Sequence, residues 1–262
     1  MRVQLILFLF IFIVSCGTVP QKSFKNEATL FATSWFQNSG ESRALFYQGY
    51  YTATEELKKE LKARKKAKAY RKPLAVVLDL DETVLDNSPY NAGLLARGES
   101  YPKGWSEWCA AAKAKSLPGA KEFLDFANSN NVEIFYVSNR DEAAKEATIK
   151  NLEQLLIPVK AQNVRLKVKS SGKEERRLAI AEKFNVVLFM GDNLNDFSDK
   201  FEKLNAVGRK NKVDELRGQF GPLFIAFPNP MYGDWEGAVY EYNWKQGDAE
   251  KNQKHQTLLE AF

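Results

Sequence analysis

Histidine and cysteine are scarce in this sequence, and their scarcity excludes several kinds of catalytic centre. The 262 residues contain one histidine and two cysteines. The lone His255 lies in a polar stretch near the C-terminus, so a zinc site built from several histidines is excluded. Cys16 and Cys109 provide no disulfide framework, and Cys109 is predicted to be a small buried hydrophobic residue. The fold must therefore depend on a packed core, for which 44% hydrophobic residues suffice.

The apolar run at the N-terminus, Leu5–Val14, is too short to span a bilayer as a helix. It follows Arg2 and is typical of a secretory signal peptide, which we place at residues 1–15. The next residues, IVSCG around Cys16, resemble a bacterial lipobox, in which the cysteine becomes the lipidated first residue of the mature protein. Residues 16–30 are then a lipidated N-terminus and a polar tether; a plain signal peptide with an incidental cysteine is the alternative.

Gly17 follows the cysteine where an aspartate would favour retention in the inner membrane. We therefore predict an extracytoplasmic protein with a lipid anchor in a bacterial outer membrane. The net charge is only +5, and no motif for reading nucleic acid is present, so no nucleic-acid partner is predicted. The basic run Lys58–Lys72 follows an amphipathic pattern and predicts a solvated helix face, with polyanion binding as the alternative.

Helical and strand patterns alternate along the rest of the chain. From Ala28 to Tyr70, apolar residues recur at helical spacings, with a break near Asn38–Gly40. Short apolar runs without clean alternation then predict buried parallel strands. The predicted strands are Leu74–Leu80, Val132–Asn139, Val186–Asp192 and Leu223–Phe227, and the predicted helices are Gly119–Asn130, Asp141–Leu156, Lys173–Phe184 and Asp199–Lys203. This alternation predicts an α/β fold with a Rossmann-like parallel sheet flanked by helices.

Polar side chains follow three of the predicted strands at the point where each strand ends. Such ends meet at one edge of a parallel sheet, where sites form. Carboxylates, a hydroxyl, amides and a lysine are therefore expected to meet there. They are Asp79 and Asp81 after the first strand, Ser138, Asn139 and Arg140 after the second, Lys173 at the start of a helix, and Asp192, Asn193 and Asp196 after the third.

These motifs in this order resemble the haloacid dehalogenase superfamily of phosphatases, and a finer resemblance covers most of the mature chain. WFQNSGESRALFYQ, DLDETVLDNSPY, YVSNRD, GDNLNDF and PNPMYGDWEGA together resemble the bacterial class C acid phosphatases. That family implies a phosphatase domain over residues 31–262 with a haloacid dehalogenase-like core. A small helical subdomain would come from residues 31–70 and from an insertion at 87–131. Phosphatases that use a histidine or a Cys-x5-Arg nucleophile are excluded, because no such motif is present.

The resemblance also implies roles for the clustered residues. Asp79 matches the nucleophile that forms an aspartyl-phosphate, and Asp81 matches the general acid and base. Mg²⁺ would be held by Asp79, Asp192 and the backbone carbonyl of Asp81, since hard oxygen ligands suit this ion. Ser138 and Asn139 would donate hydrogen bonds to the phosphoryl group, and Lys173 would neutralise charge. Asp196 and Thr83 are expected to support the site, while Tyr232 and Trp105 are expected to line the substrate slot.

The expected activity is Mg²⁺-dependent hydrolysis of small phosphomonoesters, plausibly 5′-nucleotides. Phosphoryl transfer to an acceptor alcohol on the same fold is one alternative, and a ligand-binding surface lipoprotein without enzymatic activity is another. The role of Arg140 is open between phosphate contact and a structural ion pair. The oligomeric state is open as well, with a dimer as one option.

Overall fold

The computed structural model describes residues 24–66 and 72–262, with side chains from residue 28 onward. The predicted signal peptide and Cys16 lie outside these residues. The predicted tether lies outside them up to residue 23, and its last part belongs to helix α1 (Phe24–Asn38). Within the described part of the chain, no helix combines the length and the apolar character needed to cross a membrane.

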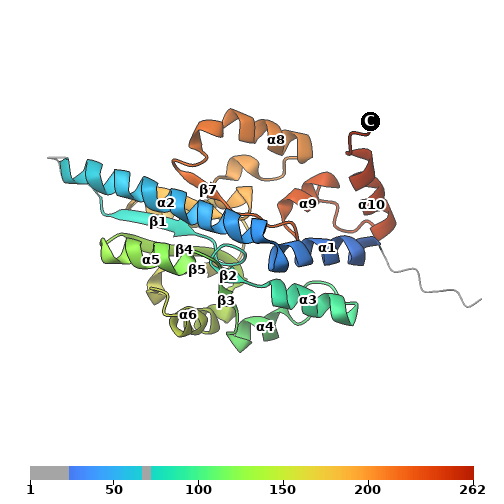
Figure 1. Cartoon of the computed structure of the whole chain (residues 1–262), viewed down its shortest axis with the longest axis horizontal. Helices are drawn as coiled ribbons and strands as arrows, with labels where there is room; N and C mark the ends of the chain where they lie inside the picture. Colours follow the sequence, from blue (N-terminus) through green and yellow to red (C-terminus); the bar gives the residue numbers. More distant parts are fainter. Residues whose placement is uncertain (1–23, 67–71) are drawn as a thin grey trace, which may run out of the picture.

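A five-stranded parallel sheet forms the centre of the molecule (Figure 1). Its strands, in spatial order, are β5 (Val164–Lys167), β4 (Glu133–Asp141), β1 (Leu74–Leu78), β6 (Asn185–Gly191) and β7 (Phe224–Ala226). The predicted α/β fold is confirmed. The sequence did not reveal β5, because its four residues, VRLK, alternate between buried and exposed positions instead of forming an apolar run.

Helices cover both faces of the sheet because successive strand residues point to opposite sides. On one face, Val76 and Leu78 pack against helix α2 (Gly40–Lys66) and helix α5 (Ala120–Ser129) in the largest hydrophobic cluster. On the other face, Val77 and Ala75 pack with Ile180 of helix α7 (Glu174–Ala181). Central strand β1 is thus buried from both sides, in agreement with its uninterrupted apolar sequence.

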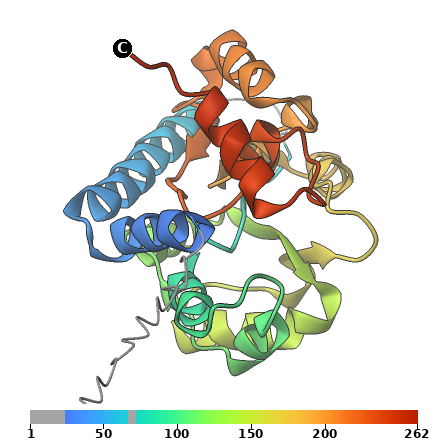
Figure 2. The same cartoon turned by 90° about the vertical axis from the view of Figure 1, so that its right-hand side faces the viewer.

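The remaining elements lie around this core (Figure 2). The chain between β1 and β4 carries β2 (Leu85–Asp86), α3 (Ser88–Arg97), α4 (Trp105–Ala111), β3 (Lys115–Ser116) and α5. We call residues 88–118 the insertion. Of the helices expected to form a helical subdomain, α2 and α5 pack directly on the sheet, whereas α1 packs against α3 and α4 packs against α6 (Lys145–Gln154).

Helices α8 (Ala206–Glu215), α9 (Asp234–Val239) and α10 (Asp248–Thr257) complete the chain, and none of the three was predicted from the sequence. Short 3-10 turns connect the larger elements. They are η1 (Glu142–Ala144), η2 (Ala161–Asn163), η3 (Leu194–Asp196), η4 (Asp199–Phe201) and η5 (Arg217–Gln219). The predicted helix Asp199–Lys203 is the 3-10 turn η4, and it ends two residues early.

Candidate active site

The chain coils back on itself immediately after β1, and this coil sets the directions of Asp79 and Asp81. The backbone N–H of Asp79 donates to Met190 O of β6 at 2.9 Å, which keeps Asp79 in line with the sheet. The carbonyl of Leu80 then accepts from the N–H groups of Val84 and Leu85, at 2.9 and 2.8 Å. Glu82 takes a left-handed conformation (φ 56°) that tightens the turn. The strand therefore ends in a compact loop that presents two carboxylates.

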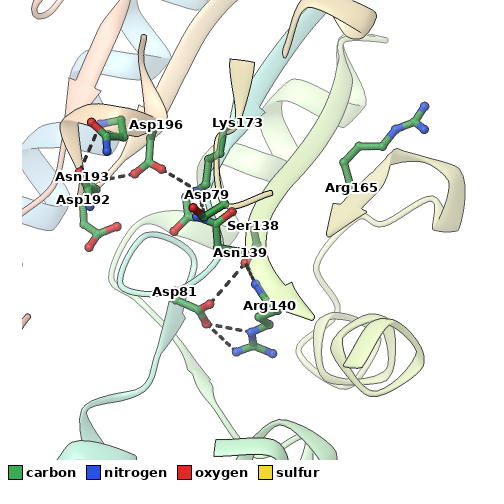
Figure 3. Close-up of polar contacts among 12 residues, drawn as sticks. Asp79, Asp81, Ser138, Asn139, Arg140, Arg165, Lys173, Asp192, Asn193 and Asp196 are labelled. Carbon is green, nitrogen blue, oxygen red and sulfur yellow. Dashed lines mark hydrogen bonds and ion pairs between the residues drawn. The ribbon is translucent and has the colours of Figure 1, made fainter. Parts of the chain in front are cut away.

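Lys173 stands between two of the carboxylates (Figure 3). Its Nζ lies 2.5 Å from Asp79 Oδ1 and 2.6 Å from Asp196 Oδ1. Lys173 is the residue that precedes α7, and it is only 6% exposed. The other lysines in this stretch do not reach the cluster: Lys167 pairs with Asp141 at 2.7 Å, and Lys169 is exposed. The structure therefore brings Lys173, the lysine singled out from the sequence, into contact with Asp79 and Asp196.

Three carboxylates gather at this edge with more negative charge than the lysine balances. Oxygens of Asp79, Asp192 and Asp196 lie within 4.8 Å of one another. Burial raises the pKa of Asp79 to about 7, even though Lys173 opposes the rise. Burial also raises the pKa of Asp192 well above its usual value, and the charges of Asp196 and Asp79 add to that rise. A cluster that resists ionisation in this way fits a divalent cation with oxygen ligands.

The contacts of the three carboxylates distinguish the groups that could hold a metal. Both oxygens of Asp196 are engaged, Oδ1 by Lys173 and Oδ2 by the N–H of Asn193 at 2.9 Å. Asp192 Oδ2 accepts from Asn229 Nδ2 at 2.8 Å, and among the described residues no hydrogen bond reaches Asp192 Oδ1 or Asp79 Oδ2. Asp79 and Asp192 therefore retain an oxygen for an ion, while Asp196 fits the supporting place predicted for it.

Asp81 faces the same edge but belongs to a different network. Its Oδ1 accepts from Arg140 Nε at 2.9 Å and from Asn87 Nδ2 at 2.8 Å, and it forms an ion pair with Arg140 Nη2 at 2.7 Å. Arg140 thus forms the ion pair that was one of its two predicted roles. The hydroxyl of Ser138 lies 3.4 Å from Asp81 Oδ2.

The two residues predicted to contact phosphate differ in their surroundings. Ser138 is fully buried, and its Oγ also accepts from the N–H of Arg140 at 3.1 Å. Asn139 is exposed, and its Oδ1 accepts from Arg176 Nη2 at 2.7 Å. Arg176 donates in addition to the carbonyl of Ser138 at 2.7 Å, so its guanidinium braces the loop that carries both residues.

The two predicted slot residues belong to different parts of the chain. The ring of Trp105 stacks near the guanidinium of Arg140, 5.6 Å from its Cζ, and contacts the ring of Tyr90. Tyr232 lies in the loop after β7, packed against the main core, three residues from the Asn229 that contacts Asp192. Trp105 is therefore next to the Asp81 network, and Tyr232 belongs to the same loop as the Asn229 that contacts Asp192.

Thr83 is buried, yet its side chain does not brace the loop as expected. Its Oγ1 finds no hydrogen-bond partner among the described residues. The backbone carbonyl of Thr83 instead accepts from the hydroxyl of Tyr50 in α2, at 2.7 Å. The support for this loop therefore comes from the main chain of Thr83 and from the hydroxyl of Tyr50.

Sequence reasoning missed three contributors to the site. Arg176 was passed over, although it follows Lys173 by one helical turn and so lies on the same side of α7. Asn229 was passed over because it lies in a Pro-rich loop without periodicity. Asn87 lies within the motif DLDETVLDNSPY, which by itself does not show that this residue is fully buried and contacts Asp81 directly.

The site thus combines a buried aspartate with a lysine, a second aspartate held by an arginine, and a group of oxygens suited to a cation, all at the carboxyl edge of a parallel sheet. Acidic groups, a lysine and oxygens suited to a cation in this arrangement fit an enzyme that acts on phosphate esters. Residues 13–235 match the family model described as HAD superfamily, subfamily IIIB (acid phosphatase), and the chain belongs to that family of acid phosphatases.

Solved structures of a bacterial relative agree with this assignment. The class C acid phosphatase from Bacillus anthracis is 44% identical, with a TM-score of 0.85, and the match covers 91% of this chain and 99% of that chain. A structure of the Bacillus anthracis enzyme with tungstate bound matches at 43% identity with a TM-score of 0.85, over 92% of this chain and 100% of that chain. The predicted family and the predicted enzyme class, a phosphomonoesterase, are confirmed.

Proposed function

We propose that this acid phosphatase hydrolyses small phosphomonoesters in two steps through an aspartyl-phosphate on Asp79, with Mg²⁺ as its cofactor. The observation that carries the proposal is the buried contact between Asp79 and Lys173 at 2.5 Å, beside the carboxylates of Asp192 and Asp81. A carboxylate is a weak nucleophile, and it is effective only where the structure aligns it with phosphorus and offsets the charge of the phosphate.

In the first step, Asp79 attacks phosphorus as the bond from phosphorus to the leaving oxygen breaks. Asp81 gives its proton to that oxygen, so the product leaves as an alcohol. In the second step, Asp81 takes a proton from water while the water oxygen attacks phosphorus. The bond from phosphorus to Asp79 then breaks, and inorganic phosphate is released. Each proton lost by Asp81 is regained within the cycle.

The charges of the site suit this reaction. Lys173 neutralises part of the charge on Asp79 and on the group being transferred. Asp79, Asp192 and the carbonyl of Asp81 would hold Mg²⁺. When bound, the ion would polarise the phosphoryl group and screen the carboxylates from it. Ser138 Oγ and Asn139 Nδ2 would donate to phosphoryl oxygens, and the contact with Arg176 orients the amide of Asn139 for that purpose. Binding of tungstate, a tetrahedral oxyanion, by the Bacillus anthracis enzyme is consistent with such a site.

Two features favour nucleotides among possible substrates. Trp105 lies over Arg140, Tyr232 belongs to the loop whose Asn229 contacts Asp192, and aromatic rings stack readily on nucleobases. A cell does not readily import a charged nucleotide, so an enzyme outside the inner membrane would gain a nucleoside by removing the phosphate. Lipidation of Cys16 and an outer-membrane location complete the proposal and are supported by the sequence around that cysteine.

The activity is tested with the soluble chain from residue 17 to 262. Phosphate release from 5′-nucleotides and from p-nitrophenyl phosphate is measured with Mg²⁺ and with EDTA, and acceptor alcohols are added to detect transfer instead of hydrolysis. Asp79→Asn is expected to be inactive towards all substrates. Full activity of Asp79→Asn would contradict the proposed mechanism. Equal activity of the wild-type chain in EDTA and in Mg²⁺ would also contradict it.

The anchor is tested separately in bacteria that express the full chain. The wild-type protein is expected to incorporate labelled fatty acid and to sediment with outer membranes. Cys16→Ser is expected to lose the label and to move to the soluble fraction. Sedimentation of Cys16→Ser with membranes would show that something other than a lipid on Cys16 holds the protein.

A further inference from the structure

The two carboxylate oxygens of Asp81 lie in unlike surroundings. Oδ1 contacts three donor groups: Arg140 Nε at 2.9 Å, Arg140 Nη2 at 2.7 Å and Asn87 Nδ2 at 2.8 Å. Among the described residues, Oδ2 has only the hydroxyl of Ser138, at 3.4 Å. Oδ1 accepts two hydrogen bonds, from Arg140 Nε and Asn87 Nδ2, and is paired with the charged Arg140 Nη2, so it has no lone pair left for a proton. The proton that Asp81 exchanges during catalysis therefore belongs on Oδ2.

Arg140 is itself held in one orientation. It is only 2% exposed, and its Nη1 donates to Thr148 Oγ1 of α6 at 3.2 Å. Its Nη2 also donates to Asn87 Oδ1 at 3.3 Å, and the Trp105 ring lies over its guanidinium. A planar guanidinium with contacts on its edges and its face cannot rotate without breaking several of them. The direction of the Asp81 carboxylate is thus fixed by Arg140 of β4, which is itself held by Thr148 of α6.

A second connection leads from Asp81 into the insertion. Asn87 is fully buried; its Oδ1 accepts from Trp108 Nε1 of α4 at 2.8 Å, and its backbone N–H donates to Glu82 Oε1 at 2.8 Å. The amide of Asn87 thereby has its donor end on Asp81 and its acceptor end on Trp108. The indole N–H of Trp108, at 2.8 Å, and Arg140 Nη2, at 3.3 Å, both donate to Asn87 Oδ1 and together determine which way the amide points.

We propose that Arg140 is a positioning residue for the general acid: it fixes Asp81 Oδ1 so that Oδ2 faces the leaving oxygen, and Asn87 and Trp108 make this placement depend on the insertion. The proposal rests on the proposed function, because it assumes that Asp81 supplies the proton. Arg140 does not touch the reacting atoms in this arrangement, so its removal affects the proton transfer and leaves the attack of Asp79 intact.

The dependence of rate on the leaving group distinguishes this role from a structural one. An alkoxide is strongly basic, so it must receive a proton as the bond from phosphorus to oxygen breaks. p-Nitrophenolate is stable as an anion and leaves without one. Misplacement of Asp81 Oδ2 therefore slows phosphoryl transfer from benzyl phosphate much more than from p-nitrophenyl phosphate, which has a similar shape.

The experiment measures the first turnover of each ester with Mg²⁺ present, so that only formation of the aspartyl-phosphate is observed. Arg140→Gln is expected to lower the rate with benzyl phosphate by about 100-fold, the lower range of what general acid catalysis contributes, and the rate with p-nitrophenyl phosphate by less than about 5-fold. The matched control is Arg165→Gln, because Arg165 is exposed and points away from the cluster in Figure 3. It is expected to leave both rates unchanged.

Equal loss with both esters would overturn the proposal, since it would assign Arg140 to phosphate binding or to folding alone. Because Arg140 is buried and its variant can fail to fold, Trp108→Phe provides a milder second test. It keeps an aromatic side chain, of smaller size, and removes the indole N–H that is the shorter of the two donors to Asn87 Oδ1. It is expected to slow benzyl phosphate roughly 3- to 10-fold more than p-nitrophenyl phosphate, in proportion to a single weakened hydrogen bond.

If Trp108→Phe folds and treats both esters alike, the link to the insertion is refuted. The proposed function itself is tested by a different variant, Asp79→Asn. If Asp79→Asn turned over both esters, the aspartyl-phosphate mechanism would be refuted, whatever the rates of the Arg140 and Trp108 variants.

Discussion

Replacement of Lys173 by methionine tests how the acidic cluster is stabilised. In the metal-free protein, Lys173 is the cation that contacts Asp79 and Asp196, at 2.5 and 2.6 Å, and its side chain is 7% exposed. Removing one partner of a buried ion pair typically costs about 3–5 kcal/mol of unfolding free energy. For a chain of this size, each kcal/mol lowers the melting temperature by about 2–4 °C. Lys173→Met in EDTA at pH 8 is therefore expected to melt roughly 6–20 °C below the wild type.

The effect of pH on this variant follows from the carboxyl groups. The pKa of Asp79 is raised from 3.8 to about 7, mainly by burial, so between these values the folded state binds more protons than the unfolded state. Stability of the metal-free protein therefore falls as pH rises through this window. Lys173 lowers the pKa of Asp79, whereas Asp196 and Asp81 raise it, so removal of Lys173 is expected to raise this pKa further. The penalty of Lys173→Met is expected to be smaller at pH 5, which is below the raised pKa of Asp79, than at pH 8.

Thermal unfolding in EDTA and in Mg²⁺, at pH 5 and pH 8, provides the measurement. Mg²⁺ is expected to raise the melting temperature of Lys173→Met more than that of the wild type, because the ion would take over charge compensation. Lys167→Met is the matched control: its partner Asp141 is 65% exposed at the side chain, so this surface pair is worth at most about 1 kcal/mol. If Lys173→Met and the wild type have the same melting temperature in EDTA at pH 8, Lys173 does not stabilise the cluster.

Three further predictions concern residues that act on the site from outside. Asn229→Ala removes the amide that holds Asp192 and is expected to weaken Mg²⁺ activation by about 10- to 100-fold, measured as the Mg²⁺ concentration for half-maximal rate; an unchanged value would show that Asn229 does not orient the ligand. Arg176→Gln frees the loop of Asn139 and is expected to raise KM several-fold with a smaller change in kcat; a change in kcat alone would place its effect after binding. Tyr50→Phe leaves the buried carbonyl of Thr83 without its donor and is expected to cost about 1–3 kcal/mol in denaturant unfolding; wild-type stability would mean that another donor replaces the hydroxyl.

The central fold could be predicted from the sequence because its strands are buried on both faces. Leu74–Leu78 has no polar residue, so its apolar run is visible without any knowledge of its neighbours. The strand β5 could not be found in this way. It lies at one edge of the sheet, and its alternating residues also suit a loop, so only its pairing with β4 defines it as a strand. Helix α10 was missed for a related reason, since it has no buried residue to produce a pattern.

The composition of the site followed from strand ends, whereas its internal connections did not. A parallel sheet brings the residues after β1, β4 and β6 to one edge whatever their side chains are, so Asp79, Ser138 and Asp192 could be expected to meet. The orientation of each side chain depends on contacts that have no sequence period. Arg140 illustrates this limit, because a buried arginine near a carboxylate and a phosphate site can turn to either, and only its contacts with Asp81 decide.

The division of contacts between core and insertion has a consequence for protein engineering. Asp79, Lys173 and Asp192 are held entirely by loops of the sheet core, so this half of the machinery is modular and would tolerate exchange of residues 88–118 for a segment from another relative. Asp81 is different, because Asn87 connects it to the indole of Trp108. A chimaera built to accept new substrates would keep proton transfer from Asp81 to the leaving group only if the grafted segment returned an N–H donor to Asn87. A transplant without that donor should still form phosphoenzyme from activated esters while failing on alkyl ones.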